Sequence, residues 1–267
     1  MKPEQMQVLI TGASGGIGSE TARRLSQQGA RILAVGRNPD ALDQLLDSLS
    51  PHPSTPHRRF CADLCAANQP QQLLADLEQQ GISPNVLINL AGTNQLTLFQ
   101  AQSEAQIRRI IDTNLTATLL LTHALLPSLA QHSRARIINV GSTFGSIGYP
   151  GYVSYCTSKF ALRGFTEALQ RELADSQIQV QYFAPRATQT GLNSQAADRL
   201  NAQLKNAVDS PAQVADALVT LLSSAASSRF LGWPEKLFVK LNALFPSLVS
   251  SSIGKQLAII KQHASNS

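Results

Sequence analysis

The stretch Thr11-Gly12-Ala13-Ser14-Gly15-Gly16-Ile17-Gly18 decides the fold of this 267-residue chain. It follows an apolar run, Gln7–Thr11, that predicts a short buried strand, and it opens a helical pattern that ends near Gly29. Glycine lets the backbone turn tightly and lets a phosphate approach the N-terminus of the following helix. The strand, turn and helix together predict a nucleotide site, with contacts from Gly12, Ser14, Gly16, Ile17 and Gly18.

Strands and helices alternate along the chain after this turn. Further strands are expected at Arg31–Val35, Arg58–Ala62, Val86–Asn89, Arg136–Gly141 and Ile178–Ala184. Helical patterns lie between them at Pro39–Leu49, at Gln71–Gln80, in a long segment opened by Ser103, and at Tyr155–Ala174. This alternation predicts an α/β fold with a parallel sheet covered on both faces. We expect one domain over residues 1–228 and a C-terminal helical extension over residues 229–267.

Composition restricts the classes of function. Hydrophobic residues make up 43% of the chain and charged residues 15%, as in an ordered globular protein. The chain has no apolar run long enough to span a membrane, and no signal-type segment precedes the first strand, so a cytoplasmic protein is expected. Three cysteines without metal-type spacing favour reduced thiols and no metal site. Residues 229–267 carry five basic side chains against Glu235, a net charge of +4, so the basicity belongs to the tail and no nucleic-acid partner is expected.

The end of the second predicted strand indicates which dinucleotide the chain prefers. An acidic residue at this place would bind the ribose hydroxyls of NAD, whereas an arginine accommodates the 2′-phosphate of NADP. The chain has Gly36 where the acid would lie, and Arg37 follows it. NADP(H) is therefore the expected cofactor, although Arg37 would equally suit a solvated position before a helix capped by Asn38.

Tyr155 and Lys159 form a candidate proton donor and its partner. They are separated by four positions in a predicted helix, which places them on one face. Tyrosine ordinarily titrates near ~10, and a positive neighbour favours the phenolate. Lys159 is therefore expected to lower the pKa of Tyr155 toward the range in which proton exchange is efficient. A surface lysine lying over a half-buried tyrosine is the alternative.

Several ordered motifs over roughly residues 7–222 resemble the short-chain dehydrogenase/reductase family. Besides the glycine turn, the chain carries Asn89-Leu90-Ala91-Gly92 and Pro185-Arg186-Ala187-Thr188-Gln189-Thr190. Leu90 and Arg186 depart from the residues that the family has there, an asparagine and a glycine, and Arg186 puts the contact with the carboxamide of the cofactor in doubt. The resemblance implies a Rossmann-type doubly wound sheet and further cofactor contacts from Asp63, Asn89, Ala91, Gly92, Tyr155, Lys159, Pro185 and Thr190.

The resemblance also implies a catalytic tetrad of Asn114, Ser142, Tyr155 and Lys159. In this family a nicotinamide passes hydride to a carbonyl carbon while the tyrosine gives a proton to the oxygen. Ser142 would hold that oxygen, Lys159 would bind the nicotinamide ribose, and Asn114 would position a water that relays protons. Members of the family commonly assemble, so a homodimer or homotetramer formed through the long helices is expected.

The extension departs most from the family pattern. Leu237, Phe238, Leu241, Leu244 and Phe245 recur at helical spacing, and a second apolar set runs from Leu248 to Ile260. These helices either cover the substrate pocket or a partner subunit, or lie in a membrane surface. The tail is similar in style to tails of members that act on apolar lipids.

The sequence thus favours an NADP(H)-dependent oxidoreductase acting on a carbonyl or secondary alcohol of a hydrophobic, lipid-like substrate. Two alternatives stay open: a soluble 3-oxoacyl thioester reductase, and a non-catalytic NADP-binding regulatory protein.

Overall fold

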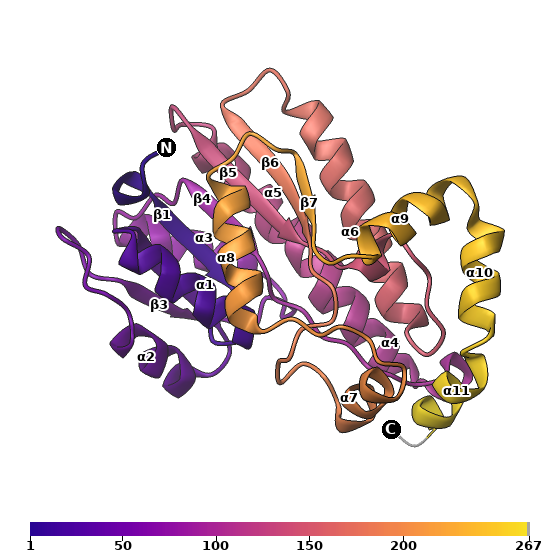
Figure 1. Cartoon of the computed structure of the whole chain (residues 1–267). Helices are drawn as coiled ribbons and strands as arrows, with labels where there is room; N and C mark the ends of the chain where they lie inside the picture. Colours follow the sequence, from indigo (N-terminus) through magenta and orange to yellow (C-terminus); the bar gives the residue numbers. More distant parts are fainter. Residues whose placement is uncertain (266–267) are drawn as a thin grey trace.

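The computed structural model describes residues 1–265 and contains one seven-stranded sheet (Figure 1). Its order is β3-β2-β1-β4-β5-β6-β7, and every neighbouring pair is parallel. The strands are β1 Gln7–Thr11, β2 Arg31–Gly36, β3 Arg58–Cys61, β4 Val86–Asn89, β5 Ala135–Val140, β6 Ile178–Ala184 and β7 Ser228–Phe230. The order reverses between β1 and β4, so the doubly wound sheet predicted from the sequence is confirmed, and a ligand site is expected at the carboxyl ends of these strands.

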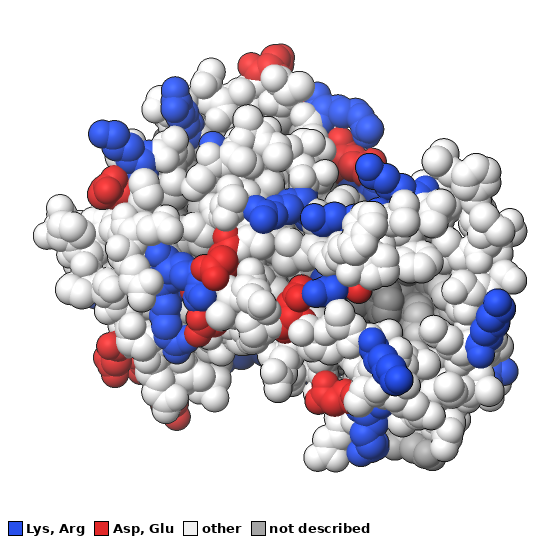
Figure 2. All heavy atoms as spheres, viewed as in Figure 1, with Lys and Arg blue, Asp and Glu red and all other residues white. Residues whose placement is uncertain are grey.

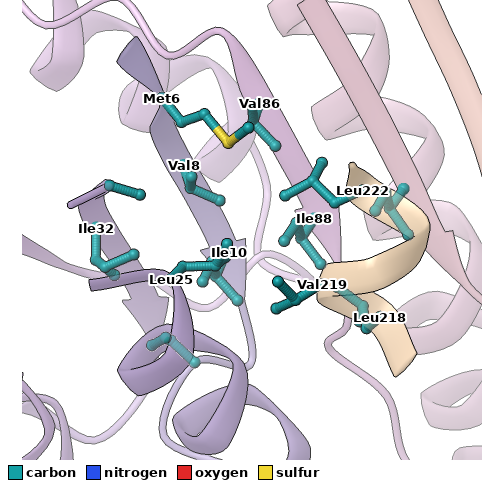
Figure 3. Packing of buried hydrophobic residues seen from close by; sticks show 14 of the residues in the cluster. Met6, Val8, Ile10, Leu25, Ile32, Val86, Ile88, Leu218, Val219 and Leu222 are labelled. Carbon is teal, nitrogen blue, oxygen red and sulfur yellow. The ribbon is translucent and has the colours of Figure 1, made fainter. Parts of the chain in front are cut away.

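Helices cover both faces of the sheet. One face carries α1 (Gly16–Gln27), α2 (Pro39–Asp47) and α8 (Pro211–Leu222), and the other carries α3 (Gln69–Gln79), α5 (Ala117–Leu129) and α6 (Val153–Glu172). Figure 3 shows the first layer, where Val8 and Ile10 of β1 pack with Leu25 of α1 and where Leu218 of α8 covers β4. Leu9 points to the opposite layer because successive strand residues alternate between faces. Burial on both faces explains why the central strands β1 and β4 are apolar at successive positions.

The long helix expected after Ser103 is interrupted. Ser103 caps α4 (Glu104–Ile111) through a capping box with Gln106, as the sequence indicated. A π-helical turn, η3 (Asp112–Thr116), then separates α4 from α5. Such turns insert an extra residue into a helix and occur frequently at functional sites. This turn buries Asn114 completely. The polar residues Asp112–Asn114, which interrupt the apolar pattern of the sequence, therefore mark the turn that directs Asn114 toward the site.

The segment after β6 also contains more regular structure than its polar sequence predicts. Helix α7 (Gln195–Gln203) is capped by Ser194, whose side chain accepts a hydrogen bond from the Ala197 amide. Its apolar residues are mostly alanines, so its helical period is weak in the sequence. The segment therefore approaches the site as a helix with flanking turns.

The extension begins beyond the sheet. The boundary expected at residue 228 falls at the first residue of β7, and three helices follow: α9 (Glu235–Leu244), α10 (Pro246–Gly254) and α11 (Leu257–Ser265). They curve away from α6 and return so that α11 contacts α7 (Figure 1). Ile260 and Ala264 of α11 are buried there. Within residues 1–265, no helix has the length and apolarity needed to cross a membrane.

Candidate active site

The glycine turn lies at the carboxyl end of β1 and opens toward a cavity. Gly12 has a φ of +66°, and a Cβ atom at this position would lie 2.9 Å from Cα of Ala91. The Thr11 hydroxyl oxygen accepts hydrogen bonds from the amides of Leu90 and Ala91, at 3.0 and 3.1 Å, and so joins the turns after β1 and β4. Gly15 precedes α1 without a side-chain cap. The first amides of α1 are therefore available to an anion such as a dinucleotide pyrophosphate.

Residues at and just beyond the carboxyl ends of β2 and β3 line the same cavity. Gly36, Arg37 and Asp63 all contribute to its wall. A Cβ atom at Gly36 would lie 3.3 Å from Cδ2 of Leu42, so a larger side chain would be crowded there. Asp63 accepts a hydrogen bond from the Cys65 amide at 3.1 Å, which orients its carboxylate. At this end of the cavity, Arg37 and Asp63 offer a cation and an anion to a nucleoside.

Ser142, Tyr155 and Lys159 meet at the ends of β5 and α6. The Ser142 hydroxyl accepts a hydrogen bond from the Phe144 amide at 3.1 Å, in the short 3-10 turn Thr143–Gly145. A hydrogen bond also joins the side chains of Ser142 and Tyr155. Lys159 Nζ lies 5.8 Å from the centre of the Tyr155 ring and donates to the carbonyl oxygen of Val140 at 3.0 Å. All three residues line the cavity.

The acidity of the pair differs from the sequence-based expectation. Burial raises the pKa of Tyr155 to about 12, and the hydrogen bond with Ser142 acts in the opposite direction without reversing the shift. Burial also lowers the pKa of Lys159 to about 8. The predicted depression of the Tyr155 pKa by Lys159 is therefore wrong for the chain alone. The spacing of the two residues shows that they are neighbours but gives no measure of their burial.

Asn114 supports the site from beneath. Its side-chain oxygen accepts from the Thr93 amide at 2.7 Å, and its amide nitrogen donates to the Thr93 carbonyl at 2.9 Å and to the Ser158 hydroxyl at 3.0 Å. These bonds tie η3 to the turn after β4 and to α6. A Cβ atom at Gly92 would lie 3.3 Å from Asn114 Oδ1 and 3.8 Å from Lys159 Nζ. Both polar groups therefore lie next to Gly92.

One cavity of about 980 Å³ joins these parts. It runs from the glycine turn and Arg37 past Tyr155 and Lys159 to the extension. No cluster of histidine, cysteine and acidic residues able to hold a metal occurs in residues 1–265.

Comparison with known proteins assigns the family. A model of the short chain dehydrogenases matches residues 6–201. The chain belongs to the short-chain dehydrogenase family of oxidoreductases. It is 33% identical over 204 residues to nodulation protein G of a Rhizobium species, covering 76% of this chain and 79% of the relative. It is 30% identical over 228 residues to the 3-oxoacyl-[acyl-carrier-protein] reductase FabG of Rickettsia felis, covering 82% and 90%.

Solved structures of the fold carry nicotinamide dinucleotides. A short-chain dehydrogenase from Sphingobium yanoikuyae in complex with NADPH superposes with a TM-score of 0.77, at 26% identity, covering 92% of this chain and 95% of the other. A 4-hydroxyisoleucine dehydrogenase complexed with NADH also gives 0.77, at 23% identity, covering 86% and 99%. The glycine turn, the uncapped start of α1 and the cavity in this short-chain dehydrogenase fit such a group.

Two of the predicted contact residues do not line the cavity of this short-chain dehydrogenase. Asn89 is buried and donates to the Thr122 hydroxyl at 3.0 Å and to the Asn139 side chain at 2.8 Å. Gly18 is also buried, where a side chain would collide with the carbonyl of Gly12. The other predicted cofactor residues form the wall: Gly12, Ser14, Gly16, Ile17, Arg37, Asp63, Ala91, Gly92, Tyr155, Lys159, Pro185 and Thr190.

Arg186 replaces the family glycine and links two segments of the dehydrogenase. Its guanidinium pairs with Asp209 at 2.7 Å and with Glu235, at the start of α9, at 3.2 Å. Thr190, in the same segment, lies 3.0 Å from the place where a Cβ atom of Gly16 would be. In the sequence, Arg186 is visible only as a departure from the family pattern. The nearby acidic residues lie 23 and 49 positions away in the sequence, so no local signal revealed the pairing.

The substrate side of the cavity is mainly apolar. A pocket covered by the extension was one of the alternatives from the sequence, but the aromatic residues of the wall were not predicted. Phe144 stacks on Tyr149 with ring centres 4.9 Å apart, and Tyr152 lies 6.1 Å from Tyr155. The Tyr149 hydroxyl donates to Gln256 of the extension at 3.4 Å. Further residues of the extension complete the wall: Phe238, Val249, Ser252 and Ile253. The extension therefore forms part of the active-site cavity of this dehydrogenase.

Proposed function

We propose that the chain is an NADP(H)-dependent oxidoreductase that transfers a hydride between the nicotinamide and the carbonyl or secondary alcohol of a hydrophobic substrate. The observation that carries this proposal is the single cavity that holds Ser142, Tyr155 and Lys159 between a dinucleotide-binding turn and an aromatic wall. A non-catalytic NADP-binding protein would not need all three polar groups at the apolar end of the cavity.

The side chains suit reduction of a carbonyl. A bound nicotinamide supplies the hydride. Tyr155 stays protonated over the whole physiological range because burial raises its pKa to about 12, so it is available to donate a proton to the substrate oxygen. Ser142 lies within hydrogen-bond reach of Tyr155 and holds the same oxygen. Lys159, whose pKa lies at about 8, holds the nicotinamide ribose and carries a proton that Tyr155 can regain.

The choice of substrate class rests on the cavity wall. Phe144, Tyr149, Phe238 and Val249 offer rings and aliphatic groups to a substrate, with Ser252 and Gln256 as polar neighbours on the extension. We expect NADPH oxidation with long-chain ketones or aldehydes and much slower turnover of short polar ones. A panel of ketones, aldehydes and 3-oxoacyl thioesters, followed by loss of NADPH absorbance, tests this. Absence of turnover with every member would favour the regulatory alternative.

A 3-oxoacyl thioester reductase is the second candidate. The 30% identity to the Rickettsia felis reductase over 82% of this chain favours it. A thioester acyl chain would suit the same apolar wall. The panel separates the two, since a thioester-specific enzyme would reduce 3-oxoacyl thioesters much faster than simple ketones of equal length.

The cofactor preference is expected to depend on Arg37. We expect NADPH to bind more tightly than NADH, because a guanidinium forms charge-assisted hydrogen bonds with the 2′-phosphate. Arg37→Ala should weaken NADPH binding by about tenfold to a hundredfold and leave NADH nearly unaffected. Titration of dinucleotide fluorescence measures both dissociation constants. Arg171→Ala, at an exposed position near the end of α6, is the control, and equal affinities in the unsubstituted protein would refute the preference.

We also propose a cytoplasmic homodimer or homotetramer. Leu120 on α5 and Phe160 on α6 are large apolar side chains that are 46% and 44% exposed. The two long helices would bury them against a second copy.

A further inference from the structure

The first helix of the extension presents apolar side chains to solvent. Val239 is buried against the domain, and Leu237 and Leu244 lie about 200° and 140° from it around the helix axis, on the outer face. Leu244 is 71% exposed. An ordinary surface helix of a globular protein carries polar residues on this side. The outer face of α9 is therefore as apolar as a helix face that is normally buried.

Neighbouring residues extend this surface. Trp233 precedes α9 and is 73% exposed, and Leu248 on α10 is 63% exposed. We call the outer apolar surface formed by Trp233, Leu237, Leu244, Phe245 and Leu248 the apolar rim. Figure 2 shows the surface over α9 and α10 largely free of charge, with basic side chains at its borders. Exposed apolar surface of this kind marks an interaction site.

Charge identifies the partner. Lys236 and Lys240 are one turn apart and border the outer face of α9. The only acidic residue of the extension is Glu235, and it is already paired with Arg186. A second copy docked through the same surface would bring these lysines close to their own counterparts, which is unfavourable. An anionic surface with an apolar interior would accept both the lysines and the rim.

We propose that the apolar rim docks on the surface of an anionic lipid membrane, with Lys236 and Lys240 among the headgroups and the apolar side chains at the acyl boundary. Such helices lie in the plane of the interface and do not cross it. Phe238, on the same helix as Leu237 and Leu244, lines the cavity and is 37% exposed. This inference rests on the proposed function. Docking would place the cavity next to the membrane, in which an apolar substrate dissolves.

Vesicle co-sedimentation of the full chain tests this proposal. We expect the protein to pellet with equimolar phosphatidylglycerol and phosphatidylcholine vesicles at low salt, and to stay in the supernatant with phosphatidylcholine alone. Lys236→Gln combined with Lys240→Gln should weaken binding by about 30-fold at low salt, since each basic residue near an anionic surface contributes about a fivefold gain. High salt should weaken binding of the unsubstituted protein in the same way.

A second pair of variants separates docking from misfolding and from self-association. Leu244→Ser with Leu248→Ser should abolish binding, whereas Phe99→Ser with Val208→Ser, which removes exposed apolar side chains elsewhere, should preserve it. Light scattering reports the mass of each variant. A lower mass for the rim variant with unchanged vesicle binding would show that a second copy covers the rim and would overturn the proposal. So would intact protein that ignores anionic vesicles at low salt.

The failure of docking can be told apart from failure of the proposed function. Reduction of the ketones, aldehydes and 3-oxoacyl thioesters of the panel by NADPH is measured in the absence of vesicles, where the rim is not engaged. Docking without turnover would refute the oxidoreductase assignment, and turnover without docking would refute the membrane surface.

Discussion

Replacing Tyr155 with phenylalanine is expected to lower turnover by about 10³-fold while dinucleotide affinity stays nearly constant. The substitution removes one hydroxyl and leaves the ring that packs beside Tyr152 and Phe144. A positioned general acid typically contributes about 10² to 10⁴ in rate. The Tyr182 hydroxyl does not replace the lost donor, because it is buried and donates to the Ser142 carbonyl oxygen at 3.3 Å.

Steady-state kinetics and NADPH titration measure the two quantities. Thr157→Val is the matched control, since it removes a hydroxyl from the same helix at an exposed position where the hydroxyl bonds only the Val153 carbonyl. The control should retain its rate. Comparable turnover by the phenylalanine variant would contradict the role given to Tyr155, and joint loss of turnover and NADPH binding would show damage to the cavity instead.

Lys159→Met is expected to change how stability depends on pH. In the folded protein without dinucleotide, burial lowers the pKa of Lys159 from 10.5 to about 8. Below about pH 8 both the folded and the unfolded chain carry the charge, and the folded state bears its full desolvation cost of roughly 3 kcal/mol. Above pH 8 the folded chain releases the proton first. The cost then disappears as the pH approaches 10.5, where the unfolded chain also becomes neutral.

The free energy of unfolding of the unsubstituted protein, relative to the methionine variant, should therefore rise by about 3 kcal/mol across this window. Urea unfolding at a series of pH values measures it. Lys261→Met, at an exposed position of α11, is the control for loss of a lysine. A difference that is constant with pH would mean that Lys159 is not held in a desolvated ammonium state. The Lys159→Met variant should also lose turnover. The substitution is therefore expected to raise the free energy of unfolding at neutral pH and to abolish activity.

The sheet could be predicted from the sequence because most of its strands are mainly apolar. The ends of Gln7–Thr11, Val86–Asn89 and Ile178–Ala184 were predicted correctly, since Gly12 and Pro185 follow the first and third runs and Asn89 ends the second. The break between α4 and α5 was not predicted. A π turn differs from an α-helix by one residue, and only the polar triplet at Asp112–Asn114 indicated it.

The cavity could be predicted only in part. Local motifs identified the glycine turn and the group formed by Ser142, Tyr155 and Lys159, since each motif places its side chains through one turn or one helix. The direction of the Tyr155 pKa shift could not be predicted, because desolvation depends on segments from across the chain. The burial of Asn89 could not be predicted either, because its side chain bonds the side chain of Asn139, 50 residues away. Arg186 and the aromatic wall likewise depend on contacts with the distant extension.

The attachment of the extension has an evolutionary consequence. Asn242 donates to the Ser146 carbonyl at 2.9 Å and Gln256 accepts from Tyr149, so two joints hold the extension against the segment that follows Ser142. A third joint, the pair of Glu235 with Arg186, holds it against the segment after β6. The dinucleotide turn and Lys159 take no part in these joints. Substitutions in the last thirty or so positions can therefore change, during evolution, which substrate the chain recognises. The residues that bind the coenzyme stay the same.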